Sequence, residues 1–142
     1  MILWWPPQYI FFIIPKLYFG KIQNIYCGYS HNIILNDNNE VFVCGNNSVG
    51  QLGLGDYNRR NIYTKLEHNF GKIKNIFCCG FHNIILNENN ELYVCGNNEY
   101  GQLGLGDWNN RNTYTKLDLQ FDIFNKKPIE HILELNLGEI VI

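Results

Sequence analysis

The sequence predicts an all-β fold built from antiparallel four-stranded units, and three observations carry this prediction. The chain of 142 residues contains 22 Asn and 18 Ile but no Ala, the strongest helix former. Residues 19–66 align without a gap to residues 70–117, and 35 of these 48 positions are identical. Within each copy, short apolar runs alternate with Asn- and Gly-rich turns, as strands do. The chain therefore contains two copies of one strand-rich unit.

Each copy supplies four short strands in the same order. In the first copy, Ile22–Cys27 and His31–Asn36 are apolar-rich runs. Residues 37–40 form a tight turn, because Asn tolerates the left-handed conformation that such turns require. The continuous apolar run 41–44 predicts a strand buried on both faces, and a fourth strand at 62–66 follows a glycine-dense loop. The second copy repeats these strands at residues 73–78, 82–87, 92–95 and 113–117.

The repeat length and strand order predict the domain organisation. Units of four antiparallel strands that recur every 51 residues are typical of β-propeller blades. We expect full blades at residues 19–69 and 70–117. Residues 15–17 align with the end of the repeat, so residues 1–18 are predicted to end a divergent partial blade. Residues 118–142 lack the repeat motif and are predicted to form a divergent partial blade or a tail, which leaves the propeller incomplete.

The repeat carries a specific motif. A Cys and a His flank the first turn, and Gly-Asn-Asn precedes Gly-Gln-Leu-Gly-Leu-Gly-Asp at the same distance in both copies. Over residues 20–117 this pattern resembles regulator of chromosome condensation repeats. The resemblance implies a seven-bladed β-propeller in complete family members. The chain departs from the family pattern at Cys79, which replaces Gly28 of the first copy, and at Cys44 and Cys95, which stand where an aromatic is common.

The motif residues are predicted to be structural. We expect His31 and His82 to make a hydrogen bond that ties their turn to a neighbour, and Asp56 and Asp107 to cap backbone amides. The glycines that shape the loops are Gly45, Gly50, Gly53 and Gly55, with their copies Gly96, Gly101, Gly104 and Gly106. A phosphate-binding loop is not expected, because it requires Gly-Lys-Ser/Thr or a strand-to-helix junction.

Neither a metal site nor a catalytic site is expected. Two Cys-x-x-x-His pairs, Cys27 with His31 and Cys78 with His82, could supply four zinc ligands, but they lie in different blades. Paired carboxylates such as Asp37 with Glu40 and Glu88 with Glu91 occupy the hairpin turns, where they are usually solvated. The sequence therefore predicts a protein that is not an enzyme and has no cofactor. The adjacent Cys78 and Cys79 are predicted to be small buried hydrophobic residues.

Composition and the N-terminal segment limit the cellular compartments in which we expect the protein. The formal net charge of −2 disfavours binding to nucleic acid or anionic membranes through bulk charge. The apolar residues 1–15 lack a basic start, and Pro6, Pro7 and Pro15 interrupt them before they reach the length of a membrane span. Five cysteines are an odd number, which does not indicate a disulfide framework. We expect an intracellular protein, cytoplasmic or nuclear, that is not secreted.

The loops that differ between the copies are the candidate binding surface, since binding residues concentrate in loops and since aromatic and Arg side chains anchor interfaces. The candidate partner-binding residues are Tyr57, Arg59 and Arg60 in the first copy and Trp108, Asn109 and Arg111 in the second. In the alternative interpretation, Arg60 and Arg111 brace their own loops and the aromatic residues cover the blade.

The leading hypothesis for function is a non-enzymatic protein-interaction module. The alternative, implied by the family resemblance, is a guanine-nucleotide exchange factor or another regulator of a small GTPase. A further alternative is a truncated propeller fragment without independent function. Two isolated blades would expose apolar faces, which the terminal segments could cover or a homo-oligomeric ring could bury.

Overall fold

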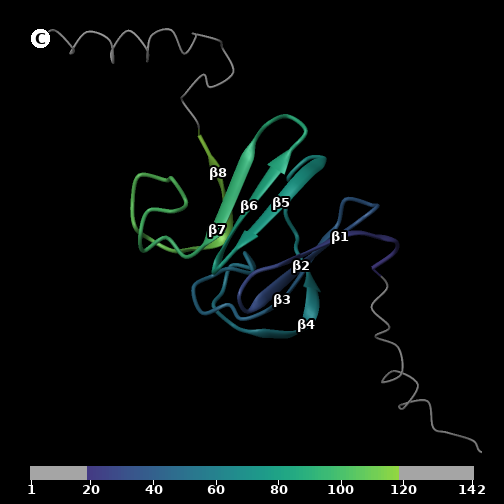
Figure 1. Ribbon diagram of the computed structural model, residues 1–142, viewed down its shortest axis with the longest axis horizontal. Helices are drawn as coiled ribbons and strands as arrows, with labels where there is room; N and C mark the ends of the chain where they lie inside the picture. The colour runs from purple at the N-terminus through teal and green to yellow at the C-terminus, as the bar shows by residue number, and fades with distance from the viewer. Residues whose placement is uncertain (1–18, 119–142) are drawn as a thin grey trace, which may run out of the picture.

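The computed structural model describes residues 19–118, which form two four-stranded antiparallel sheets and contain no helix (Figure 1). The first sheet has the order β1 (Ile22–Cys27), β2 (His31–Asn36), β3 (Val41–Gly45) and β4 (Arg60–Lys65). The second has the order β5 (Ile73–Cys79), β6 (His82–Asn87), β7 (Leu92–Gly96) and β8 (Arg111–Leu117). The prediction of four antiparallel strands in each repeat is confirmed. The segments 1–18 and 118–142, predicted to be partial blades, lie outside the described residues, apart from Asp118.

The strand limits depart from the sequence prediction where glycines alter the pairing. β4 and β8 begin at Arg60 and Arg111, two residues earlier than predicted. Arg60 pairs with Gly45 and Arg111 pairs with Gly96, each across an irregularity in the register. Since a bulge allows pairing to resume after a local kink, each last strand starts inside the segment assigned to the loop.

The tight turns between the second and third strands have the predicted chemistry. Asn39 and Asn90 adopt φ angles of 64° and 60°, in the left-handed region that Asn tolerates. In the first turn, Asn36 Oδ1 accepts hydrogen bonds from the N–H groups of Asn38 at 3.0 Å and Glu40 at 2.8 Å. The Asn-rich composition therefore serves the turns directly.

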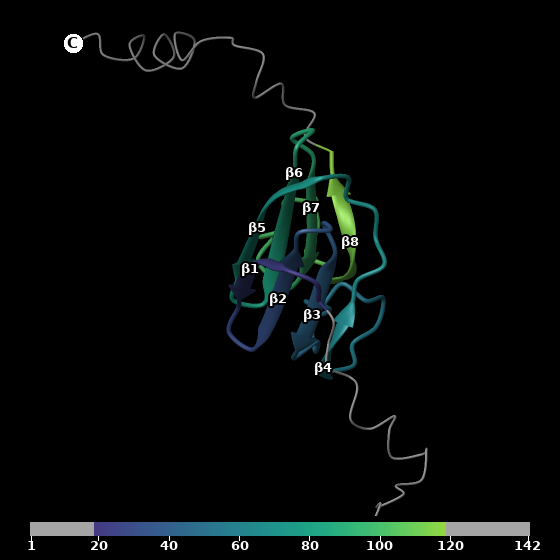
Figure 2. The same cartoon turned by 90° about the vertical axis from the view of Figure 1, so that its right-hand side faces the viewer.

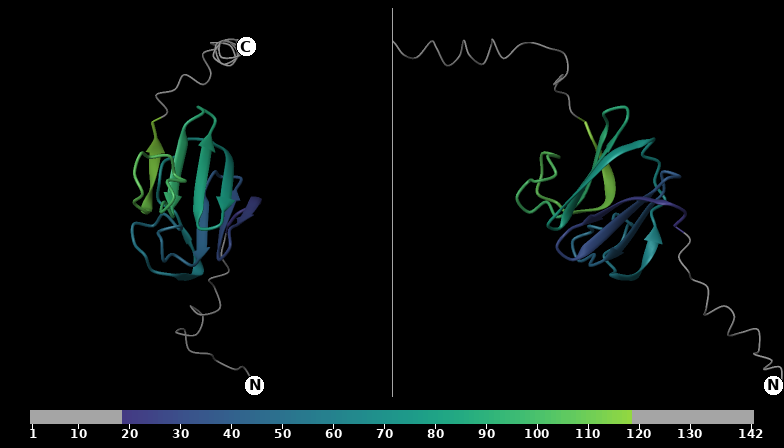
Figure 3. Two further views of the ribbon diagram at one scale, coloured as in Figure 1. Left: turned by 60° about the vertical axis from the view of Figure 1, so that its left-hand side comes forward. Right: turned by 45° about the vertical axis from the view of Figure 1, so that its right-hand side comes forward.

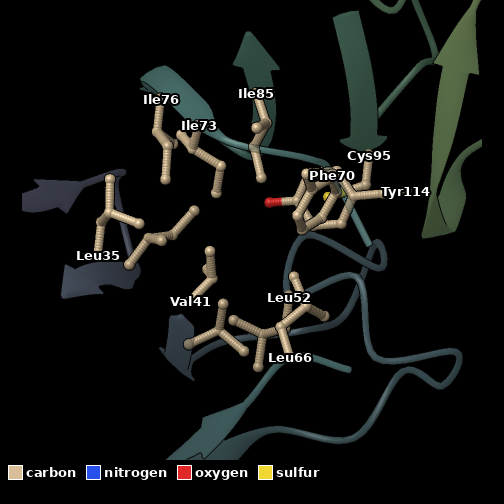
Figure 4. Packing of buried hydrophobic residues seen from close by; sticks show 12 residues of the cluster. Leu35, Val41, Leu52, Leu66, Phe70, Ile73, Ile76, Ile85, Cys95 and Tyr114 are labelled. Carbon is tan, nitrogen blue, oxygen red and sulfur yellow. The ribbon is translucent and has the colours of Figure 1, made fainter. Parts of the chain in front are cut away.

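The two sheets stack face to face, with β1 beside β5 at one edge and β4 and β8 at the other (Figures 2 and 3). The main core lies between them. Leu35, Val41 and Leu66 from the first repeat point toward Ile73 and Ile76 from the second (Figure 4). All five side chains are at most 6% exposed. Burial of aliphatic side chains against the opposite sheet therefore supplies the main stabilisation of the pair.

The cysteines differ from the prediction in one respect. Cys79 is exposed and Cys78 only half-buried, so the prediction that both are buried is wrong for Cys79. The reason is that β5 extends to Cys79, which pairs with His82 at the open end of the sheet. Cys95, by contrast, is fully buried between the sheets. In the part of the chain that the structure describes, no helix is long and apolar enough to cross a membrane.

Candidate interaction surface

The predicted partner-binding residues all lie at one end of the two sheets. In an antiparallel order, the connections β1–β2 and β3–β4 emerge at the same end, as do β5–β6 and β7–β8 (Figure 1). We call this side the loop end. The residues in question are Tyr57, Arg59, Arg60, Trp108, Asn109 and Arg111.

A buried asparagine holds each long loop in shape. Asn47 is fully buried, and its Oδ1 accepts a hydrogen bond from the N–H of Leu52 at 2.9 Å. Its Nδ2 donates to the carbonyl oxygen of Asp56 at 2.8 Å. Asn98 makes the same two bonds, at the same distances, in the second repeat. Since the side chain supplies partners for backbone groups that solvent does not reach, it fixes the shape of the loop.

An Asp–Arg pair closes the base of each loop. The Arg60 guanidinium lies 2.5 Å from Asp56 Oδ2 and also donates to the carbonyl oxygen of Asn58 at 2.7 Å. Asp56 Oδ1 accepts a hydrogen bond from the N–H of Asn58 at 2.8 Å, as predicted for a capping residue. The hydrogen bonds from Arg60 and Asn58 hold the pKa of Asp56 below its usual value.

The second repeat has an equivalent pair. The Arg111 guanidinium lies 2.6 Å from Asp107 Oδ2, and its hydrogen bond lowers the pKa of that carboxyl group. Both arginines thus bond to their own loops. This is the geometry expected if Arg60 and Arg111 brace their loops and do not bind a partner. The more exposed candidates are Arg59, Asn109, Tyr57 at 54% and Trp108 at 73%.

Three further exposed aromatic residues lie at the loop end and are not among the predicted binding residues. Tyr29, Phe81 and Tyr100 are 82%, 43% and 87% exposed. Tyr29 and Phe81 come from different sheets, and their rings meet edge to face with centroids 5.5 Å apart. Phe81, Tyr100 and Val49 line a surface hollow of about 430 Å³ that joins the two repeats. Phe81 and Tyr100 replace Ser30 and Val49 of the first copy, a difference that could have marked them.

The first repeat histidine belongs to the contact between the sheets. His31 is 1% exposed, and its Nε2 lies 2.7 Å from Asn83 Oδ1. Asn83 Nδ2 donates to the carbonyl oxygen of Gln51 at 2.5 Å, so Asn83 Oδ1 faces the histidine and Nε2 is the donor. Nδ1 is buried without a partner among the described residues, and burial lowers the pKa of His31. The imidazole is therefore neutral and structural at pH 7.

The described residues contain no candidate cluster of metal ligands. Within residues 19–118, no group of three or more His, Cys, Asp or Glu side chains is placed to hold a metal ion. Burial raises the pKa of Cys78 and of Cys95 to about 12, so both thiols are protonated at pH 7.

Both repeats match a known sequence family. One model of the regulator of chromosome condensation (RCC1) repeat matches residues 22–51 and 73–102, and a second matches residues 38–86 and 89–119. The chain belongs to the RCC1 repeat family. Each sheet is therefore one RCC1-type β-propeller blade, and the described chain contains two blades.

Known RCC1-repeat proteins match parts of this chain. Protein RCC2 homolog of Xenopus laevis is 41% identical over 59 residues, which is 41% of this chain and 12% of the relative. The X-linked retinitis pigmentosa GTPase regulator homolog of Caenorhabditis elegans is 35% identical over 60 residues, 41% of this chain and 4% of the relative. This RCC1-repeat chain thus spans a small fraction of the relatives it matches.

A solved RCC1 structure has the same fold. The structure of Kap60 bound to yeast RCC1 (Prp20) aligns with a TM-score of 0.62 and 22% identity. The alignment covers 70% of this chain and 25% of that chain. The two RCC1-type blades thus correspond to about a quarter of the length of a larger propeller protein.

Proposed function

We propose that this chain is a non-enzymatic protein-interaction module that binds a partner protein through its loop end. The observation that carries the proposal is the exposed aromatic group Tyr29, Phe81 and Tyr100 at the loop end. Phe81 and Tyr100 line a hollow shared by both blades, and the ring of Tyr29 packs against Phe81. Large exposed aromatic side chains beside a hollow are typical of protein-binding surfaces, because they bury much apolar area at a small entropic cost. Tyr57 and Trp108 extend the exposed aromatic surface along the same end.

The rigidity of the loops supports this assignment. Asn47, Asn98 and the Asp–Arg pairs bond the loops to themselves, so little conformational entropy is lost when a partner docks. The loop end also presents Arg59 beside the aromatic residues, and Arg is enriched in interface anchors. The proposed binding residues are therefore Tyr29, Tyr57, Arg59, Phe81, Tyr100, Trp108 and Asn109.

A matched pair of variants tests the proposal. The loop-end variant replaces Tyr29, Tyr100 and Trp108 with Ser, and all three are more than 70% exposed. The control variant replaces Lys72 and Glu88 with Ser, an exposed ion pair at 2.7 Å near the opposite end of the sheets. Proteins captured from cells of the source organism are quantified by mass spectrometry for wild type and both variants. We expect specific partners to be lost with the loop-end variant alone, and equal capture by all three would contradict the proposal.

A second candidate is regulation of a small GTPase. It is favoured by the Caenorhabditis elegans relative, whose name describes a GTPase regulator homolog and which is 35% identical over 60 residues. The test is the release of fluorescent GDP from purified small GTPases in the presence of the full chain. Acceleration that the loop-end variant abolishes would assign this role to the loop end. Equal release with and without the chain would remove the candidate for the GTPases tested.

A third candidate is a propeller fragment without function of its own. This candidate predicts a chain that aggregates or melts without cooperativity, because unsealed blade faces are apolar. The shared core between the two blades argues for a folded unit. A single sharp thermal transition of the purified chain, followed by circular dichroism, would contradict the fragment hypothesis.

A further inference from the structure

The contact between the two blades joins two different faces of the repeat. The first blade contributes what we call its leading face, formed by His31, Ile33, Leu35 and Val41, all at most 3% exposed. The second blade contributes its trailing face, whose side chains are at most 6% exposed. These trailing-face residues are Phe70, Ile73, Ile76, Asn83, Cys95 and Tyr114. Because the two faces differ, the contact has a direction along the chain.

Hydrogen bonds set the register of this contact. His31 bonds Asn83 at 2.7 Å at one end of the sheets. At the other end, Asn39 Oδ1 accepts from the N–H of Ile73 at 2.7 Å, and Asn39 Nδ2 donates to the carbonyl oxygen of Gly71 at 2.8 Å. Polar pairs at both ends of an apolar patch orient the two blades as well as holding them together.

Because the blades are repeats, each has a leading face and a trailing face. The contact between the blades uses one of each, so the described chain has one more trailing face, on the first blade, and one more leading face, on the second. The trailing face of the first blade carries Ile22 at 42% and Ile25 at 58% exposure, whereas the equivalent Ile73 and Ile76 are 6% and 2% exposed. Ile22 and Ile25 lie on one face because of a register irregularity between them, and the same irregularity occurs in β5.

The leading face of the second blade is also incompletely covered. Its residues Ile84, Leu86 and Leu92 are half-buried, whereas the equivalent Ile33, Leu35 and Val41 are at most 3% exposed. Phe77 of β5 is 45% exposed, while its equivalent Tyr26 packs against the core between the blades. Among the described residues, the leading face of the second blade therefore exposes apolar area. The equivalent area of the first blade is buried.

We propose that two copies of this chain dock head to tail. The first blade of one copy would pack on the second blade of the other, in the way that β5–β8 pack on β1–β4 within one chain. The trailing face of one copy would cover the leading face of the other. The residues that make the polar bonds of the existing contact recur unchanged at the new one. His82 and Asn32 would repeat the His31–Asn83 bond, and Asn90 would repeat the bonds of Asn39 to Gly20 and Ile22 of the next copy.

Such a contact is heterologous, because it joins two different surfaces, and it leaves one unused face at each end. Repetition of the contact gives a ring if the rotation closes and an open chain of molecules if it does not. Trp108 would stay exposed in this contact, since its equivalent Tyr57 remains 54% exposed beside the existing one. Tyr100 would lie at its edge, because the equivalent Val49 lines the hollow between the two blades.

The test uses one substitution on each face of the full chain. Ile25→Glu alters the trailing face and Phe77→Glu the leading face. Both sites are more than 40% exposed, so the fold of the single chain should tolerate the change. Trp108→Glu is the matched control, because its equivalent Tyr57 is exposed in the formed contact. Mass is measured by light scattering after size exclusion over a range of concentrations.

We expect the wild type and Trp108→Glu to self-associate in a concentration-dependent manner. Each face variant should weaken association by at least about 100-fold, because an unpaired carboxylate would be buried in an apolar contact. An equimolar mixture of Ile25→Glu and Phe77→Glu should give a one-to-one dimer and nothing larger, because each variant keeps the face that the other lacks. Only a head-to-tail contact predicts this recombination.

Several outcomes would overturn the proposal. A wild type that stays monomeric at all concentrations would show that other parts of the chain cover the faces. Association that survives both face substitutions would place the contact elsewhere. Association that only one of the two substitutions abolishes would indicate a contact between identical faces. Two monomeric face variants that do not recombine would also contradict the proposal, because each keeps the face that the other lacks. Circular dichroism and the melting temperature of each variant separate these outcomes from misfolding.

Discussion

At the level of single residues, the repeat places the same side chain in two different surroundings. His31 is buried against Asn83 of the second blade, whereas His82 is only half-buried. The same five residues, Asn-Ile-Ile-Leu-Asn, follow both histidines, but only His31 has the adjacent described blade packed against it. The role of a repeat residue thus depends on whether a further blade is packed against it.

The buried histidine makes stability depend on pH. Because burial lowers the pKa of His31 below 6.5, the unfolded chain takes up this proton more readily than the folded chain. The contribution is complete above about pH 6.5 and is lost as the pH falls through the folded-state pKa, with a slope of at most about 1.4 kcal/mol per pH unit. We expect urea unfolding to show a declining free energy of unfolding between pH 6.5 and pH 5.

The substitution His31→Gln should flatten this decline, since the Gln amide can still donate to Asn83 but has no proton to gain. His82→Gln is the matched control and should have a smaller effect, although burial also lowers the pKa of His82. The loop carboxylates do not interfere, because their pKa values are lowered and they titrate below this range. Equal pH profiles for wild type and His31→Gln would contradict the assignment.

The buried loop asparagines give a second residue-level prediction. Asn47→Ala would leave the N–H of Leu52 and the carbonyl oxygen of Asp56 without their partner in a buried site. We expect a loss of about 2–4 kcal/mol in the free energy of unfolding, because buried unpaired polar groups are costly. Asn58→Ala, at an exposed position of the same loop, should change it by less than about 0.5 kcal/mol. Denaturant titrations that give equal losses would refute the bracing role of Asn47.

At the level of elements, the strands were predictable because local patterns determine them. The limits of β1, β2 and β6 agree with the sequence prediction, and Asn39 and Asn90 form the turns expected of them. The starts of β4 and β8 were not predictable, because they depend on pairing with Gly45 and Gly96 in another strand. Cross-strand pairing is a tertiary property and overrides local propensity.

The candidate binding surface was predicted only in part for the same reason. The loop residues Tyr57 and Trp108 could be selected because they lie in glycine-rich loops that differ between copies. Tyr29, Phe81 and Tyr100 gather only because two turns and a loop from different blades meet at one end. Sequence spacing contains no information on how two blades are placed against one another.

Loop glycines test the blade contact at the element level. A Cβ atom at Gly50 would lie 2.5 Å from Asn112 Cα in the second blade, whereas at Gly101 the nearest atom would be Trp108 Nε1 at 3.9 Å. Both glycines have positive φ angles, of 82° and 72°, so an Ala substitution adds similar backbone strain at each. Gly50→Ala should therefore destabilise by at least about 2 kcal/mol more than Gly101→Ala, through the clash alone.

Thermal and urea unfolding of the two Ala variants measure this difference directly. The pair is well matched, because the glycines occupy equivalent positions in almost identical loops. Similar stabilities would mean that the first loop does not approach the second blade as closely as the structure places it.

At the level of the whole molecule, the two blades form a single structural unit. The buried cluster draws on both repeats, and neither sheet has a separate core of comparable extent among the described residues. In repeat proteins, stability is the sum of the stability of each repeat and that of the contact between neighbours. Here the contact contains most of the fully buried aliphatic side chains, so the unit should unfold in one step.

The substitution Leu52→Ala tests this cooperativity. Leu52 is fully buried in the cluster between the blades, so its truncation should cost about 2–5 kcal/mol. If the unit unfolds in one step, amide hydrogens in β2 and β6 should lose the same protection free energy, although Leu52 belongs to the first repeat. Tyr57→Ala, in the same loop but 54% exposed, should leave both strands unchanged. A loss of protection confined to β1–β4 would instead mean that each blade is stable on its own, and that the neighbouring blade contributes orientation more than stability.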